Sequence, residues 1–259
     1  MPLFCIGSNS DLSLKPVLQL IFEQLYEVGL REFCFVVGRG KRAVEDHFTP
    51  DWDFVKDLRD KGKSQLTSSL EAFYNTIKKS TIVWVNQPEP KGFGHAVLIA
   101  KPFVVNEPFM VCAGDTYIVS RNDDHIRRLV QAYSINRAEA TLLLQKVDDP
   151  RQYGVAVVED LSGGVFRVLK VVEKPREPPS NLAIMPMYIF KPVIFDVLED
   201  LAPGVSGEIQ LTDGIQKLID LGLKVQAIML RDDEFRLDIG TPEMYWEALK
   251  LSYEYFRVK

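Results

Sequence analysis

The sequence predicts an α/β fold with a Rossmann-like mixed, mainly parallel central sheet flanked by helices, and with a smaller antiparallel extension. In the first half of the chain, short apolar runs alternate with segments of helical period, which is typical of strands joined by helical crossovers. After about residue 139, strand-like runs follow one another directly, which indicates the antiparallel part. Because 259 residues with 46% hydrophobic content can bury one large core, we expect a single domain, residues 1–259.

Helices and strands alternate in the first half. The apolar residues of 17–28 fall on one helical stripe, with Pro16 suited to the first turn and Gly29 to the end. The other predicted helices of this half are 41–47, 64–79, 93–101 and 123–135, and its predicted strands are 33–38, 81–86 and 108–113.

The second half begins with strands. The run 140–147 comes first, and the runs 153–160 and 166–174 flank a Leu-Ser-Gly-Gly turn, which predicts two strands around it. The remaining predicted elements are a strand at 181–191, helices at 192–201 and 208–222, two strands within 224–239, and a closing helix at 241–256. The order Thr-Pro-Glu suits the start of that last helix.

Composition excludes several classes of protein. The net charge is -5, from 31 basic and 36 acidic residues without a dense Lys/Arg block, so we expect no nucleic acid and no membrane as partner. No apolar stretch approaches the roughly 18 residues of a membrane span, and the start lacks the features of a secretion signal. Cys5, Cys34 and Cys112 have no CxxC spacing, and the last two lie in apolar runs, which predicts small core residues and a cytoplasmic location.

Two aspartates are candidate metal ligands. Asp115 follows a buried strand-like run and Gly114, which places it at the carboxyl end of a central strand, where open α/β sheets bind ligands. Asp238 also follows a strand-like run and precedes a glycine and a helix start. Two such carboxylates could share one Mg²⁺, which proteins hold with one or two carboxylates together with substrate phosphates. The other interpretation of Asp115 is a turn aspartate that caps the next segment.

Two further segments could contact a ligand. The loop 87–96 has two glycines and runs into a short helix, which permits close backbone approach to a flat or anionic ligand, although a simple turn before a helix has the same pattern. Glu173 and Lys174 stand at a strand end before Pro175, where the lysine could pair with a phosphate. A solvated strand end is the other interpretation of this pair.

A series of motifs follows in order from about Lys15 to Ala248: KPVLQLI, GLREFCFVVGRGKRAVEDHF, QPEPKGFGHAVLIAKPFV, Gly-Asp at 114, YGV at 153, VVEKP at 171, NLAI with YIF, GEIQLTDGI at 207 and LDIGTPEMY at 237. Together they resemble the sugar nucleotidyltransferase family, and most closely its glucose-1-phosphate uridylyltransferases. The segment 51–63 is also similar to an insertion of that branch.

The resemblance implies Mg²⁺-dependent transfer of a uridylyl group from UTP to glucose 1-phosphate, which gives UDP-glucose and pyrophosphate. It implies that Gln87 and the Gly92 backbone read the uracil, and that Asp115 and Asp238 hold Mg²⁺. The positions that match the family's sugar and sugar-phosphate contacts are Gly154, Glu173 and Lys174, with Lys174 on the phosphate and, together with Asp115, catalytic. It also implies a homo-oligomer, a dimer or tetramer.

The sequence departs from this family in two places. Family members open with a strand and a G-x-G-T-R loop that grips the triphosphate, and residues 1–259 contain no such segment. Either the chain starts after the missing strand and loop, or the run LFCIG is a degenerate first strand and residues 7–10 are a remnant of the loop. The first interpretation is favoured because no Arg or Lys precedes Lys15. The second departure is Pro186-Met187, where a glycine is expected near the sugar.

Three functions therefore stay open. The first is a UTP–glucose-1-phosphate uridylyltransferase. The second is a weakly active or inactive homologue that has a nucleotide-sugar-binding or regulatory role. The loss of one preorganised hydrogen-bond donor lowers the rate of such a reaction by a factor of about 10² to 10³. The third is a nucleotidyltransferase with another base or sugar, because one fold hosts many specificities.

Overall fold

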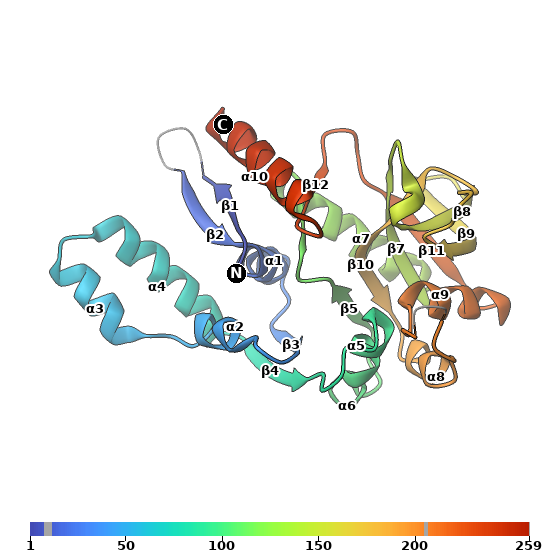
Figure 1. The fold of residues 1–259 in the computed structure, drawn as a ribbon, viewed down its shortest axis with the longest axis horizontal. Coiled ribbons are helices and arrows are strands. Elements are labelled where there is room, and N and C mark those ends of the chain that lie inside the picture. The colour runs from blue at the N-terminus through green and yellow to red at the C-terminus, as the bar shows by residue number, and fades with distance from the viewer. Residues whose placement is uncertain (8–11, 205–206, 259) are drawn as a thin grey trace. The chain divides into compact units, whose positions relative to one another are not determined.

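The computed structural model describes residues 1–7, 12–204 and 207–258, and its chain divides into two compact units (Figure 1). The first unit comprises Met1–Pro88 with Leu249–Lys259, and the second comprises Glu89–Ala248. The last helix, α10 (Pro242–Arg257), contributes to both. No helix among these residues is long and apolar enough to cross a membrane.

Among its described residues, the first unit contains two small sheets and four helices before α10. Strands β3 (Glu32–Val37) and β4 (Thr81–Asn86) pair in parallel over their whole length, and β1 (Leu3–Ile6) and β2 (Ser13–Pro16) pair antiparallel. The helices are α1 (Val17–Glu27), α2 (Arg42–His47), α3 (Trp52–Asp60) and α4 (Ser64–Lys78), of which α3 and α4 form a helical hairpin (Figure 1).

An aromatic core holds the first unit together. Phe22 of α1 contacts the rings of Phe33, Phe48 and Phe73, with ring centroids 4.6, 5.2 and 6.2 Å away. Because side chains alternate along a strand, Phe33 and Phe35 pack on this core while Cys34 between them is exposed. The prediction that Cys34 is a core residue is therefore wrong: the apolar run is a strand with only one face on this core.

The second unit is built on a six-stranded sheet in the order β5, β10, β7, β11, β9, β8. Its strands are β5 (Phe109–Cys112), β7 (Ala140–Lys146), β8 (Gly154–Asp160), β9 (Val165–Glu173), β10 (Leu182–Phe190) and β11 (Val225–Met229). Strand β8 also pairs with β10, at Val155 and Ala183, so that β10, β7, β11, β9 and β8 close into a small barrel. A separate ribbon joins β6 (Thr116–Val119) to β12 (Phe235–Asp238).

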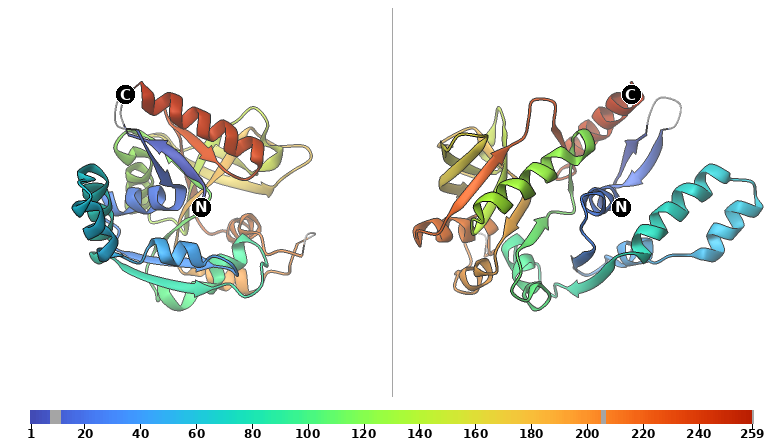
Figure 2. Two further views of the ribbon diagram at one scale, coloured as in Figure 1. Left: turned by 60° about the vertical axis from the view of Figure 1, so that its left-hand side comes forward. Right: turned by 180° about the vertical axis from the view of Figure 1, so that it is seen from behind.

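Helices cover this barrel. They are α5 (Phe93–Ile99), α6 (Lys101–Val104), α7 (Asp124–Asn136), α8 (Val193–Glu199) and α9 (Leu211–Asp220). Helix α7 lies against β7 and β11, and α9 lies against β9 (Figure 2). The structure splits the predicted helix 93–101 into α5 and α6, because Pro102 has no N–H to continue the first of them.

The mixed α/β architecture is confirmed, but the strands do not pair mainly in parallel as expected. Among the described residues, β3 with β4 and β7 with β11 pair in parallel, and the remaining strand pairs are antiparallel. The two strands expected at 153–160 and 166–174 form the hairpin β8–β9. The start of the chain had a second interpretation, in which the run LFCIG is a first strand and residues 7–10 are a remnant of the loop. Leu3–Ile6 is a strand, paired with β2, whereas Ser8–Asp11 lie outside the described residues.

Candidate functional site

One cavity of ≈ 670 Å³ in the second unit brings most of the candidate residues together. Asp115, Gly154, Glu173, Lys174 and Asp238 all line it. Asp115 directly precedes β6, Gly154 and Glu173 stand in the two strands of the β8–β9 hairpin, Lys174 directly follows β9, and Asp238 ends β12. Residues that are distant in sequence are therefore gathered by the barrel and by the β6–β12 ribbon into one polar cavity.

The two aspartates lie side by side at this cavity. Asp238 is the register partner of Thr116 across the ribbon, and Asp115 directly precedes Thr116. Burial, and secondly the charge of Asp238, raise the pKa of Asp115 above its ordinary value. The structure thus brings the two candidate carboxylates together at one cavity.

The two carboxylates fit a hard divalent cation. Two neighbouring carboxylates repel each other, and a cation bound between them offsets that repulsion. Mg²⁺ takes oxygen ligands from one or two carboxylates plus phosphates. Asp238 Oδ1 is oriented by the Gly240 N–H at 2.8 Å, and Asp115 Oδ1 by the Thr116 hydroxyl at 3.2 Å. The described residues contain no cluster of three or more His, Cys, Asp or Glu side chains.

Glu173 is fixed by a residue that the sequence analysis did not single out. The hydroxyl of Thr212, in the first turn of α9, donates to Glu173 Oε2 at 2.6 Å. Gly154 is the register partner of Glu173, and a Cβ at Gly154 would lie 2.9 Å from Thr212 Oγ1 and 3.2 Å from Glu173 Oε2. Only glycine at position 154 leaves room for this contact. Thr212 belongs to the motif GEIQLTD, which carried the family resemblance without a role for the threonine.

Lys174 has an unusual backbone conformation. Its φ of 40° lies in the left-handed region, which non-glycine residues rarely adopt and which is often found at functional sites. The Lys174 N–H donates to the Tyr153 carbonyl at 3.0 Å, which holds that turn. The ammonium lies 3.7 Å from Glu173 Oε1 and 63% of the side chain is exposed, so Nζ remains available to an anion in the cavity.

Arg236 and Tyr153 form a second pair that sequence reasoning missed. The Arg236 guanidinium carbon lies 4.1 Å from the centroid of the Tyr153 ring, and Arg236 Nη2 donates to the Tyr153 hydroxyl. Arg236 Nη1 lies 3.8 Å from Asp238 Oδ2. Tyr153 stands inside the motif YGV and Arg236 directly precedes the motif LDIGTPEMY, but their contact joins positions 83 apart, which no local pattern indicates.

The two residues expected to read the base, Gln87 and Gly92, are not among the residues that line this cavity. Gly92 has a φ of 97°, and a Cβ there would lie 2.7 Å from the Ile209 carbonyl oxygen, so the loop needs glycine for its packing in the second unit. Gln87 follows β4 in the first unit, where its N–H donates to the Val37 carbonyl at 2.7 Å.

The wall of the cavity includes the residue that departs from the family pattern. Pro186 lines the cavity at a register shift in β10 between Met185 and Tyr188. A proline has no N–H for the ladder, so an irregular point in the strand accommodates it. Its carbonyl still accepts from the Ala113 N–H at 3.0 Å. The Tyr188 ring beside it is buried, and burial raises the pKa of that phenol.

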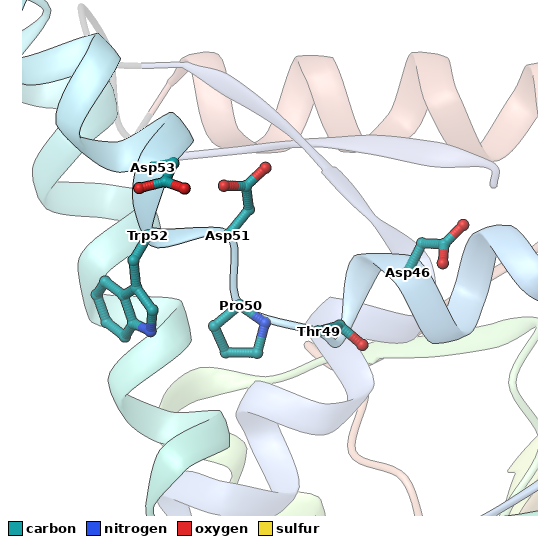
Figure 3. A pocket seen from close by; sticks show the side chains of 6 residues that line it. All are labelled: Asp46, Thr49, Pro50, Asp51, Trp52 and Asp53. Carbon is teal, nitrogen blue, oxygen red and sulfur yellow. The ribbon is translucent and has the colours of Figure 1, made fainter.

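A second hollow, in the first unit, has a different character. Its lining is acidic and carries no basic side chain: Asp46, Thr49, Pro50, Asp51, Trp52 and Asp53 (Figure 3). The Asp51 carboxylate accepts from the Phe54 N–H at 2.9 Å and so caps helix α3. Because this aspartate has a structural partner and no cationic group faces the hollow, the cavity of the second unit is the better candidate site.

The sequence matches known proteins over most of its length. Residues 12–254 match the family model described as nucleotidyl transferase. A UTP–glucose-1-phosphate uridylyltransferase of Pseudomonas aeruginosa is 37% identical over 245 residues, covering 93% of this chain and 85% of that protein. A protein of the same description from Bacillus subtilis is 37% identical over 231 residues, covering 87% of this chain and 76% of its own length. The structure of a UDP-glucose pyrophosphorylase complexed with UDP-glucose is similar with a TM-score of 0.83 and 30% identity, over 93% of this chain and 88% of that one.

Proposed function

The chain belongs to the nucleotidyl transferase family, and from that premise we propose that it is a UTP–glucose-1-phosphate uridylyltransferase. One observation carries the proposal: a pair of carboxylates, Asp115 and Asp238, shares a cavity with Glu173 and Lys174. This set of side chains combines sites for a divalent cation, a sugar hydroxyl and a phosphate in one place.

The proposed reaction is an in-line displacement at phosphorus. A phosphate oxygen of glucose 1-phosphate forms a bond to the α-phosphorus of UTP, the bond from that phosphorus to the β-phosphate oxygen breaks, and pyrophosphate leaves. Lys174 binds the phosphate of the sugar, and its charge reduces the repulsion between the two approaching anions. Glu173, oriented by Thr212, accepts hydrogen bonds from sugar hydroxyls, and Gly154 leaves room for the ring.

Asp115 and Asp238 would hold Mg²⁺, which would neutralise charge on the phosphates. In the same proposal, Gln87 and the Gly92 backbone read the uracil. Their support is the motif around the loop 87–96, which is one of the segments that carry the family resemblance.

The finer points of the architecture follow from the same assignment. We propose that both units form one nucleotidyltransferase domain with a Rossmann-like sheet, supported by the parallel pairing of β3 and β4 with helices between them.

We also propose a cytoplasmic homo-oligomer. The cytoplasmic location is supported by three free cysteines, Cys5, Cys34 and Cys112, none of which forms a disulfide.

A substrate panel tests the function. The protein is incubated with Mg²⁺, one of UTP, dTTP, ATP, CTP or GTP, and one of several sugar 1-phosphates, and pyrophosphate release is measured. The proposal expects the highest kcat/KM for UTP with glucose 1-phosphate. Higher activity with another pair would assign another base or sugar to the site.

A binding measurement separates the second candidate, a homologue that binds nucleotide sugars with little turnover. This candidate expects UDP-glucose to raise the melting temperature while every pair in the panel stays inactive. Normal turnover with UTP contradicts it.

A further inference from the structure

Arg236 occupies a position that the proposed reaction leaves unexplained. Its side chain is only 17% exposed, and it projects from β12 into the cavity, two residues before Asp238. The Tyr153 ring covers one face of the guanidinium, and the Tyr153 hydroxyl accepts from Nη2. Nη1 lies 3.8 Å from Asp238 Oδ2. Tyr153 therefore holds the arginine in place, with Nη1 within ion-pair distance of one of the paired carboxylates.

The other cations that line the cavity have different partners. Arg151 donates twice to Asp149, at 2.8 and 2.7 Å, and Lys174 lies beside Glu173. Among the described residues, Arg236 is the cation that lies within ion-pair distance of either Asp115 or Asp238. Before any ligand enters, Arg236 thus compensates one of the two negative charges, that of Asp238.

We propose that Arg236 is the resident counter-ion of Asp238, and that it makes divalent-metal binding depend on the phosphates of a nucleotide sugar. The inference rests on the proposed function, because it takes Asp115 and Asp238 as the metal ligands. A fixed positive charge this close to the carboxylates disfavours a divalent cation in the empty site. When a diphosphate enters, its oxygens offer the guanidinium a new partner and supply the ligands that a cation still lacks.

This arrangement couples the two ligands thermodynamically. If the diphosphate raises the affinity for the metal, the metal raises the affinity for the diphosphate by the same factor. Arg236 creates the coupling by weakening metal binding in the site without nucleotide. A neutral residue at position 236 then strengthens metal binding to the free protein and reduces the coupling.

Direct metal binding tests the inference without any turnover. Mn²⁺ is titrated into the protein with and without saturating UDP-glucose, and free Mn²⁺ is measured by electron paramagnetic resonance. The variants are R236Q and R236M, which remove the charge, and R236K, which keeps it. R167Q is the matched control, because Arg167 is an exposed arginine of β9 that pairs with Glu159 and does not line the cavity. Circular dichroism confirms that each variant is folded, and the two neutral variants provide independent replicates.

Without UDP-glucose, both neutral variants are expected to bind Mn²⁺ about fivefold or more tightly than the wild type, because one repulsive charge has been removed. The ratio of Mn²⁺ affinities with and without UDP-glucose falls accordingly. R236K and R167Q stay within about twofold of the wild type, since the charge at position 236 is kept.

Three results would overturn the inference. Neutral variants that bind Mn²⁺ no more tightly than the wild type without UDP-glucose contradict it while leaving the metal site intact. The same gain of affinity in R236K shows that charge is not the cause. A wild-type protein that binds no Mn²⁺ in either state removes the proposed metal site and the inference together, which distinguishes the two failures.

Discussion

Asp238 is placed beside Asp115 by a single register, the pairing of Asp238 with Thr116 in the β6–β12 ribbon. Each strand of the ribbon is only four residues long, and each carries one carboxylate at or next to its end. The loop before β12 is fastened by Glu234, which is 5% exposed and accepts hydrogen bonds from Arg128 of α7 and from the Arg231 N–H. The register that joins the two aspartates is therefore supported by a buried ion pair outside the cavity.

Gly154 leaves no room for a side chain, so Gly154→Ala is expected to displace Glu173. The new Cβ would lie 2.9 Å from Thr212 Oγ1, and overpacking of this kind costs about 1 to 3 kcal/mol. We predict that UDP-glucose binds at least about fivefold more weakly to the variant, measured by isothermal titration. Gly204→Ala is the control, because the nearest atom to its Cβ would be 3.6 Å away, an ordinary contact. Equal affinities in the two variants would show that Gly154 is not needed for sugar binding.

Thr212 orients Glu173 through one hydrogen bond, so Thr212→Val is predicted to weaken recognition of the sugar. A hydrogen bond to a charged group contributes about 1.5 to 3 kcal/mol, so KM for glucose 1-phosphate should rise roughly tenfold or more, with a smaller change in kcat. Steady-state kinetics at saturating UTP measures both constants. Thr49→Val removes a hydroxyl from an exposed threonine that donates to the Glu45 carbonyl, and it should change neither. A loss of kcat with KM unchanged would argue against the assigned role.

His125 makes the stability of the fold depend on pH. It is fully buried, Nδ1 lies 2.6 Å from the Ser120 hydroxyl, and Nε2 has no hydrogen-bond partner among the described residues. Burial, followed by the charge of Arg128, lowers the pKa of His125 from 6.5 to about 3. Between these two values the unfolded chain binds a proton that the folded chain does not, so acidification below 6.5 favours unfolding.

The corresponding measurement is the free energy of unfolding from urea titrations between pH 7.5 and 5. We predict that the wild type loses stability below pH 6.5 more steeply than His125→Asn, by up to about 1.4 kcal/mol per pH unit. Parallel curves for the two proteins would show that His125 does not titrate on unfolding in this range.

The sequence was informative where the pattern was long and local. The runs at 33–38 and 81–86 predicted β3 and β4, and the Gly-containing turn predicted the β8–β9 hairpin. Helix α3 was missed although Trp52, Val55 and Leu58 share one face of it, because the nine-residue segment is short and rich in charged residues. Strand β6 was missed because a run of four residues after Gly-Asp carries little periodicity.

Only the part of the candidate site that rests on local patterns could be predicted. Asp115 and Asp238 stand at strand ends, a position with chemical meaning that can be read from sequence, and the structure brings them together. The contacts of Thr212 with Glu173 and of Arg236 with Tyr153 join positions 39 and 83 apart. Such contacts depend on how the barrel strands pair, so no pattern along the chain could indicate them.

The central claim is that this cavity transfers a uridylyl group with the help of both aspartates. The most direct test runs the reaction backwards: UDP-glucose and pyrophosphate are mixed with the protein and Mg²⁺, and UTP and glucose 1-phosphate are followed by phosphorus NMR. We predict conversion by the wild type only when Mg²⁺ is present, and rates lower by about 10² or more in Asp115→Asn and in Asp238→Asn. No conversion by the wild type, or equal conversion by both variants and the wild type, would contradict the claim.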